Sequence, residues 1–458
     1  MNTEQRYVLG FGLIRIMTGL KNFWSVTRPY HLSRLYLYDL SLSLFSLDLV
    51  MSLATLFEFI GMALAYRAYL MLGVRTLMMF CLIGVSIGFL NSHFVTETWV
   101  FEILYPFTTG FFCGLSSIVI VYPLWKRFKR HAGLALAASR GFFILGIIPV
   151  YPLIKIVNPE DEELSKIRDK IFYTPNLMGR FSETMAYYCL IITGFGIVGC
   201  LIMNSKLKNQ AEVRQKLLKK YKNDNVEEIN LNENKILNNL ETLNGVPNDI
   251  NPRMNRNSLD TQKLIRKELN ISMAKVFAVG FMFAVMSLHS IYFEHKYVEL
   301  NISNARPLMT LGIVLIVIFI LGWAYDKYKN LTFYFGFIIM LLFLTHTWVF
   351  NHFITLHNRI CLLGLYIVFS VLVNSIEIVV AMTLLRIANG QINCHFALRT
   401  FSMTAYGAVI SCLIHIYFET RFERIDVVYE LIISTSLIIG SIVLLFIQTT
   451  HIDFGKNN

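Results

Sequence analysis

Long apolar runs make up most of the chain, and one long polar segment, Ser205 to Lys267, divides them into two groups. This segment is rich in Lys, Asn, Glu and Asp and almost free of aromatic residues. Because hydrocarbon cannot satisfy so many polar groups, the segment must lie in water. The pattern therefore predicts two membrane-embedded halves, residues 1–204 and 268–458, joined by a cytosolic polar connector at residues 205–267.

Twelve apolar runs are near or above the roughly 20 residues that a helix needs to cross a bilayer. We therefore expect an all-α polytopic membrane protein with twelve transmembrane helices in two pseudo-symmetric six-helix bundles. Arg15 and Lys21 interrupt the first run, which either crosses the membrane or lies along its surface. The expected spans are residues 7–25, 40–66, 73–94, 98–124, 132–157, 183–204, 270–293, 305–325, 331–350, 357–387, 396–418 and 427–449.

The composition supports this class. Hydrophobic residues make up 55% of the chain and charged residues only 16%, whereas soluble domains carry about 25% charged residues. We expect an integral, multi-pass protein of the plasma membrane or of an organelle membrane, with the lipid bilayer as a partner. The net charge of +11 comes from Lys and Arg in short loops and in the connector. That distribution sets membrane topology and does not favour a nucleic-acid partner.

The short motifs in the sequence do not favour a metal site, a cofactor site or a common enzyme. Seven cysteines are scattered along the chain without a CxxC pair, which argues against a disulfide framework and against a zinc site. His346, His352 and His357 are spaced so that they do not share one helical face. The sequence contains no Walker loop and no HExxH motif, and its GxSxG match, Gly84 to Gly88, lies inside an expected apolar span and not at a strand-to-helix turn. We therefore expect no metal, no cofactor and no enzyme.

Basic residues in short loops indicate which side of the membrane the connector occupies. Lys126 to Arg130 lie between spans four and five, and Lys327 and Lys329 lie between spans eight and nine. With twelve helices, both loops share a side with the connector, and an excess of Lys and Arg marks that side as cytosolic. Some basic residues, including Arg28 and Arg34, fall on the opposite side.

Two landmarks recur at nearly the same distance along the chain. Gly61 follows the same kind of span as Gly322, 261 positions later, and His131 precedes a span as His395 does, 264 positions later. A common offset indicates an internal repeat, and inverted or parallel repeats are typical of secondary transporters. The sequence therefore predicts a duplicated six-helix unit.

With six plus six spans, a long connector and the element Gly322-Trp-Ala-Tyr-Asp326-Lys327, the chain resembles the major facilitator superfamily. In that family the acidic residue of this element pairs with nearby helix ends and basic groups and helps to close the cytosolic gate. The resemblance thus implies gating roles for Gly322, Asp326 and Lys327. The first-half copy departs from the pattern, because Ala65 stands where the acid is expected.

Basic residues remain in that first-half copy, and Arg67 and Arg75 are its candidate gating residues. A second stretch, Tyr122-Pro-Leu-Trp125 followed by Arg130-His-Ala-Gly-Leu-Ala, resembles the monocarboxylate and oxalate–formate branch of the superfamily. That resemblance implies a small organic anion as the transported solute.

Charged residues inside apolar spans are the candidate binding groups, because a charge near the bilayer centre costs about 2.5–3.5 kcal/mol on insertion scales and needs a partner or a watery cavity. Arg140 lies about eight residues into span five and Arg15 lies within the first span. With Asn374 of span ten, they are the expected substrate-binding residues. The alternative for Arg140 is a structural pair with Asp48 or Glu58.

Two further residues are candidates for proton coupling. Glu377 lies in the middle of span ten, where desolvation favours a carboxyl group that takes up a proton. His289 of span seven is the second candidate. The alternatives are a salt bridge that locks the halves together for Glu377, and a hydrogen-bonded interior histidine for His289.

The sequence thus favours a secondary transporter of a small organic anion, working by alternating access with possible proton coupling. Two other functions stay open. A transport-inactive structural subunit of a larger membrane complex would explain Ala65. A polytopic membrane acyltransferase would require His346 or His352 to converge with Asn351.

Overall fold

The computed structural model describes the chain in several stretches. Met1–Ile202 and Lys275–Asn458 belong to one compact unit, and all observations below concern that unit. The connector and the last expected span lie outside the described residues, so the domain boundaries stay a prediction. The described residues are 3–19, 24–39, 44–128, 131–146, 148–157, 165–167, 170–172, 175–203, 279–280, 283, 285–287, 289–290, 293, 297, 307–328, 332–355, 358–387, 405, 409 and 413.

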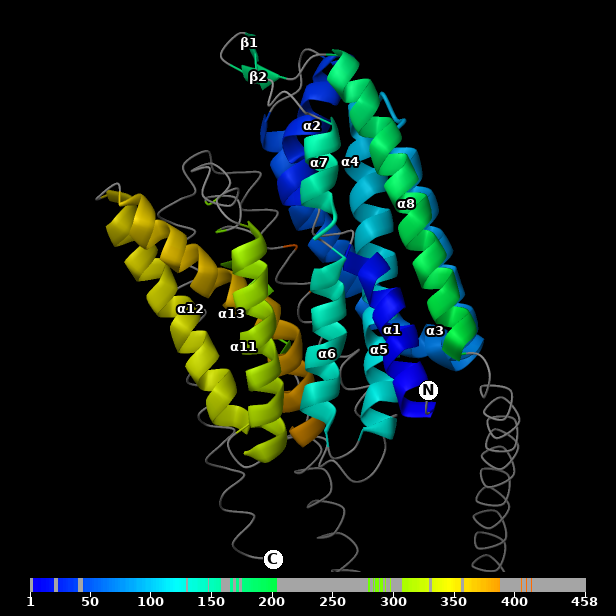
Figure 1. Cartoon of the computed structure of the whole chain (residues 1–458), viewed down its shortest axis with the longest axis vertical. Coiled ribbons are helices and arrows are strands. Elements are labelled where there is room, and N and C mark those ends of the chain that lie inside the picture. Colours follow the sequence, from blue (N-terminus) through cyan, green and yellow to red (C-terminus); the bar gives the residue numbers. More distant parts are fainter. Residues whose placement is uncertain are drawn as a thin grey trace, which may run out of the picture. The chain divides into compact units, whose positions relative to one another are not determined.

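Almost all of the described elements are helices (Figure 1). One two-stranded antiparallel hairpin, which the sequence did not predict, pairs Ser165 with Phe172. The first half contains α1 (Thr3–Thr18), α2 (Trp24–Tyr36), α3 (Leu44–Ser92), α4 (Thr98–Pro106), the π-helical turn η2 (Phe107–Phe111), α5 (Phe112–Arg127), α6 (Ala132–Leu145), α7 (Val150–Val157), β1 (Ser165–Ile167), β2 (Lys170–Phe172) and α8 (Pro175–Met203). The second half contains α11 (Pro307–Lys327), α12 (Thr332–Thr355) and α13 (Arg359–Ile387).

Helix breaks differ from the expected spans in three places. The first expected span covers most of α1 and reaches the start of α2, and the fifth is divided between α6 and α7. The second and third expected spans both lie in α3, which is interrupted at Gly73, where φ is 76° and ψ is 168°. A residue with a side chain rarely adopts such a positive φ, so glycine is required at this break.

Five helices in the described part of the chain are long and apolar enough to cross a membrane: Leu49–Val74, Asn176–Ile202, Thr310–Lys327, Tyr334–Ile354 and Arg359–Leu384. This finding supports the expected helical, multi-pass membrane protein. The count of twelve spans stays a prediction, because several expected spans fall largely on residues outside the described set.

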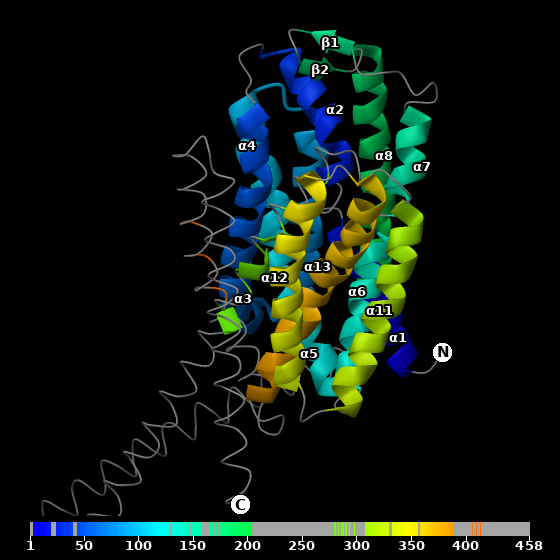
Figure 2. The ribbon, with the colours of Figure 1, turned by 90° about the vertical axis from the view of Figure 1, so that its left-hand side faces the viewer.

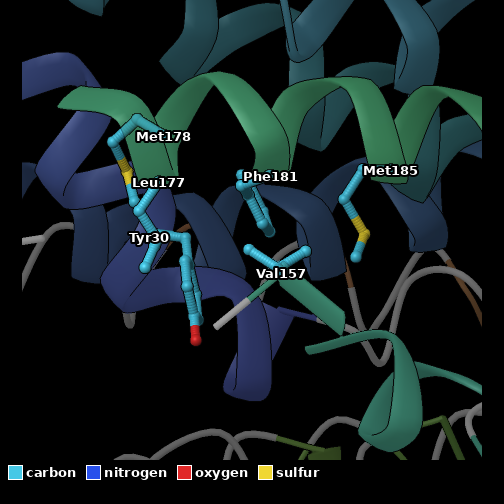
Figure 3. Packing of buried hydrophobic residues seen from close by; sticks show 6 residues of the cluster. All are labelled: Tyr30, Val157, Leu177, Met178, Phe181 and Met185. Carbon is cyan, nitrogen blue, oxygen red and sulfur yellow. The ribbon is translucent and has the colours of Figure 1, made fainter. Parts of the chain in front are cut away.

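Apolar contacts hold α2, α7 and α8 together. Figure 3 shows this cluster, in which the Tyr30 ring stacks on Phe181 with centroids 4.9 Å apart. Its members are Tyr30, Val157, Leu177, Met178, Phe181 and Met185. In the second half, α13 packs against both α11 and α12, and α11 also packs against α6 of the first half (Figure 1, Figure 2). Helix α6 therefore lies at the contact between the two halves.

A second buried cluster joins α2 to His93, which follows α3, and to Phe101 of α4. The imidazoles of His31 and His93 stack with centroids 5.0 Å apart, and Trp24 lies 5.6 Å from His31. Both imidazoles are fully buried, and within the described residues none of their four nitrogens has a hydrogen-bond partner. A buried polar group left unpaired costs about 1–3 kcal/mol. An apolar ring of the same shape is therefore expected to give a more stable fold at this position.

Replacing His31 with Phe is expected to stabilise the protein by about 1–2 kcal/mol, because the ring keeps its stacking and two unpaired nitrogens disappear. The melting temperature of the purified protein in detergent should rise. His352→Phe, at an exposed position of α12, is the control and should change it little. A fall for His31→Phe would show that the imidazole has a partner, such as a buried water.

Candidate functional site

The expected binding residues come from three helices that lie far apart in the sequence. Arg15 is in the last turn of α1, Arg140 is on α6, and Asn374 and Glu377 are on α13. The sequence of α6 begins Ala-Gly-Leu-Ala-Leu-Ala-Ala, which combines strong helix formers with small residues. Small residues allow a neighbouring backbone to approach closely, as at helix contacts in membranes.

Glu377 is the centre of an ion-pair cluster between the two halves. Its Oε1 pairs with Nη2 of Arg15, and its Oε2 accepts a hydrogen bond from Nη1 of Arg140 at 3.2 Å. The side chain of Arg15 is 2% exposed, whereas those of Arg140 and Glu377 are 14% and 16% exposed. We call this arrangement the arginine clamp: two guanidinium groups hold one carboxylate, one on each oxygen.

Neighbouring side chains fix both arginines. Nε of Arg15 donates to Oγ of Ser139 at 3.0 Å, and Nε of Arg140 donates to Oδ1 of Asn374 at 3.3 Å. The Asn374 amide also donates to the backbone oxygen of Ser370 at 2.8 Å. Asn374 therefore orients Arg140 in this structure, and both hydrogen-bonding ends of its amide are occupied.

An aromatic ring lies under the two guanidinium groups. Cζ of Arg140 is 4.2 Å from the ring centroid of Phe143, and Cζ of Arg15 is 5.7 Å from it. The negative face of an aromatic ring attracts a cation, most strongly where water is excluded. Glu58 of α3 lies near enough for its charge to act on both arginines. The cluster thus contains two cations in direct contact with one carboxylate and a second carboxylate nearby.

The alternatives for the arginines and for Glu377 can be compared with this geometry. The direct partner of Arg140 is Glu377 of the other half, and the side chain of Asp48 lies outside the described residues. The contact between Arg140 and Glu377 is a salt bridge between the halves, which was the alternative to proton coupling for Glu377. Roles in substrate binding and proton coupling stay predictions for all three residues.

His289 belongs to a different cluster, in the second half. Its Nε2 and Oγ1 of Thr347 are 2.8 Å apart, and its ring stacks on Phe293 with centroids 4.4 Å apart. His346 lies 5.5 Å from His289, and its Nε2 is 2.8 Å from the hydroxyl of Tyr297. This is the hydrogen-bonded interior histidine that the sequence left open. A role of His289 in proton coupling stays a prediction.

The described histidines of α12 lie in different environments, because His346 is buried and His352 is exposed. The acyltransferase alternative, with His346 or His352 beside Asn351, stays untested. Among the residues that the structure describes, no group of three His, Cys, Asp or Glu side chains is arranged to hold a metal ion.

The gating candidates of the second half contact the start of α6. Oδ1 of Asp326 accepts a hydrogen bond from the backbone nitrogen of Gly133 at 2.8 Å, and Oδ2 accepts one from that of Leu134 at 2.9 Å. The N-cap residue of α6, His131, makes no side-chain cap of its own. The carboxylate of α11 therefore caps α6, and its charge is favourable at the positive end of the helix dipole.

Gly322 makes this approach possible. A Cβ added to Gly322 would lie 2.6 Å from the backbone oxygen of Gly133 and 2.7 Å from Cβ of Ala137. A Cβ added to Gly133 would in turn meet the backbone oxygen of Gly322. We call this crossing of α6 and α11 the glycine seam, because both helices need glycine there.

The basic gating candidates lie elsewhere. Nζ of Lys327 is 4.7 Å from the ring centroid of Trp323 and 5.3 Å from that of Tyr328, on an exposed part of α11. Arg67 is exposed on α3, and the side chain of Arg75 lies outside the described residues. The structure thus brings Gly322 and Asp326 to α6 and does not show Lys327 or Arg67 there. Their gating roles stay predictions.

Sequence reasoning missed Ser139 and Phe143. Ser139 precedes Arg140, and Phe143 lies three residues after it. Ser139 and Phe143 are thus four residues apart, and this spacing places the two side chains on one helix face. The spacing could be read from the sequence, but Ser and Phe are common in membrane helices. Their shared neighbour Arg15 lies on another helix, so the sequence does not show the contact.

Comparison with known proteins identifies the fold. No protein-family model and no curated protein matches the sequence. The chain is similar to the solved structure of XylE, a proton:xylose symporter of the major facilitator superfamily, bound to 6-bromo-6-deoxy-D-glucose. The TM-score is 0.62, the identity is 14%, and the match covers 97% of this chain and 95% of XylE. At this identity the likeness shows the fold alone, and it does not single out the monocarboxylate or oxalate–formate branch. The chain therefore shares its fold with XylE.

Proposed function

We propose that the chain is a secondary transporter that moves a small organic anion by alternating access, with Arg15 and Arg140 binding the anion. The arginine clamp supports this proposal most directly. Guanidinium groups match the geometry of a carboxylate and keep their charge when buried. Two of them hold one carboxylate between the halves, and a solute carboxylate of the same chemistry fits the same two groups.

Proton coupling through Glu377 follows from the same contacts. While Glu377 is charged, it occupies both arginines. When it takes up a proton, its attraction for them falls, and a solute anion can bind in its place. XylE is named as a proton:xylose symporter, which supports coupling to protons. Two buried cations favour an anion over a neutral sugar as the solute of this chain.

Alternating access would require the two halves to separate on one side at a time. The glycine seam and the Asp326 cap join the halves at the start of α6. We propose that they form the closed gate on the side that the basic loops mark as cytosolic. The clamp lies farther along the same helix, at Arg140, where it would respond to the solute.

A structural subunit is the second candidate, because the same clamp would also lock the halves together. Ala65, in place of an acid in the first-half loop, favours this alternative. The two candidates differ in one observable property, because a locked protein neither takes up nor exchanges a solute.

Uptake of radiolabelled lactate into proteoliposomes, driven by an inward proton gradient, tests the proposal. Wild-type protein should transport lactate, and Arg140→Gln should lower kcat/KM about 30-fold or more, because losing one partner of a buried charge pair costs about 2–5 kcal/mol. Arg180→Gln, at an exposed position of α8, is the matched control and should behave like the wild type.

Other outcomes would point elsewhere. Uptake of xylose without uptake of any carboxylate would overturn the assigned solute. Absence of uptake and of exchange for carboxylates, sugars, amino acids and nucleosides would favour the structural subunit. Unchanged lactate kinetics in Arg140→Gln would remove Arg140 from the binding site.

A further inference from the structure

The arginine clamp poses a physical problem that its three charged residues do not solve. Two guanidinium groups repel each other, and Glu377 holds both of them by ion pairs. Glu58 also acts on both by its charge. When Glu377 takes up a proton, part of the attraction that keeps the two groups together is lost before a solute anion binds. Neighbouring side chains that contact the two groups without titrating would keep them in place.

We infer that Ser139 and Phe143 are positioning residues that hold Arg15 and Arg140 on one carboxylate site. This inference rests on the proposed function. It concerns how the two arginines keep their positions when Glu377 is protonated. Both residues are buried, at 6% exposure each, and both belong to α6, the helix that also carries Arg140.

Ser139 fixes the arginine that comes from another helix. Its hydroxyl oxygen accepts a hydrogen bond from Nε of Arg15, and Arg15 is only 1% exposed. Fixing Nε leaves the two Nη groups at the far edge of the guanidinium plane, and it is Nη2 that reaches Glu377. Without Ser139, the buried Nε would lose its acceptor, and the plane would be free to turn away from the carboxylate.

Phe143 acts on both cations at once. Its ring faces Arg140 at 4.2 Å and Arg15 at 5.7 Å. A shared aromatic face attracts each guanidinium and so opposes their mutual repulsion in a site with little water. A leucine would fill much of the same space but offers no such face. The arrangement Ser139, Arg140 and Phe143 thus lets one helix hold both arginines.

Equilibrium binding of labelled lactate to the purified protein, followed by exchange in proteoliposomes, tests the inference. Ser139→Ala and Phe143→Leu should each raise the Kd for lactate about tenfold, while the maximal exchange rate at saturating lactate changes less than about twofold. Ser139→Thr and Phe143→Tyr, which keep the hydroxyl and the ring, should restore a Kd near that of the wild type.

Matched controls come from the same class of position. Ser116→Ala removes a buried hydroxyl that donates to the backbone oxygen of Cys113, and Phe350→Leu removes a buried ring of the second half. Both should leave the Kd for lactate unchanged. An unchanged Kd in Ser139→Ala and Phe143→Leu, or an equal rise in the controls, would overturn the inference.

A ligand-free measurement separates this inference from the proposed function. The melting temperatures of Phe143→Leu, Glu377→Gln and the double variant form a double-mutant cycle. We expect a non-additive effect, because both residues act on the same guanidinium groups. If the wild type binds no lactate, the proposed function fails. The double-mutant cycle then tests by itself whether Phe143 positions the arginines. Additive changes would then show that Phe143 does not hold the arginines.

Discussion

Replacing Glu377 with Gln is expected to lower the melting temperature of the protein and to abolish uptake driven by a proton gradient. Glu377 is the carboxylate that directly contacts both Arg15 and Arg140, and removing one partner of a buried ion pair costs about 3 kcal/mol or more. Glutamine keeps the shape of the side chain and cannot release a proton. Exchange of lactate across the membrane without a proton gradient should persist, because the amide resembles the protonated acid.

Thermal unfolding in detergent and uptake into proteoliposomes measure the two effects separately. Glu183→Gln removes a carboxylate at an exposed position of α8 and should change neither. A melting temperature equal to that of the wild type would show that the clamp contributes little to stability. Proton-driven uptake at the wild-type rate would assign the coupling to another residue, with His289 the next candidate.

Replacing Gly322 with Val is expected to open the glycine seam. The new Cβ would lie 2.6 Å from the backbone oxygen of Gly133, and a backbone atom cannot move aside as the end of a side chain can. Overpacking of this kind costs about 1–3 kcal/mol. Because α6 and α11 belong to different halves, the strain is relieved when they separate, which also breaks the Asp326 cap.

Alkylation of a reporter cysteine checks this expectation. Ala132 begins α6 and is 3% exposed, so Ala132→Cys should react slowly in the parent and about tenfold faster with Gly322→Val, since 1.4 kcal/mol corresponds to a factor of ten. Gly312→Val is the matched control on the same helix, because a Cβ added there meets nothing within 4 Å. Equal reactivity in the two valine variants would mean that the seam does not hold the gate closed.

The effects expected for Glu377→Gln and for Gly322→Val both depend on helix α6. Helix α6 is capped at its first turn by Asp326, crosses α11 at Gly133, and presents Arg140 to Glu377 farther along. In the proposed transporter, a movement of α6 that releases one of these contacts would shift the others. Such a link would couple the proposed gate at one end of α6 to the proposed binding site along its length.

Local properties of the sequence determined that the chain is a helical membrane protein. The length and apolarity of a run decide whether it can cross hydrocarbon, and neither depends on the rest of the chain. The same logic marked Arg15, Arg140 and Glu377, because a charge in an apolar span needs a partner whatever the fold. Gly322 and Asp326 followed from a short motif in adjacent positions.

Only the tertiary structure decided which partners these residues have. Arg15 and Glu377 are 362 positions apart, and their contact depends on how α1, α6 and α13 pack. No local pattern encodes that packing. Ser139 and Asn374 each contact an arginine of another helix, and Phe143 lies against Arg140 of its own helix and Arg15 of α1. The position of His289 in an apolar span likewise did not indicate its neighbours. The structure places it beside Thr347 and Phe293.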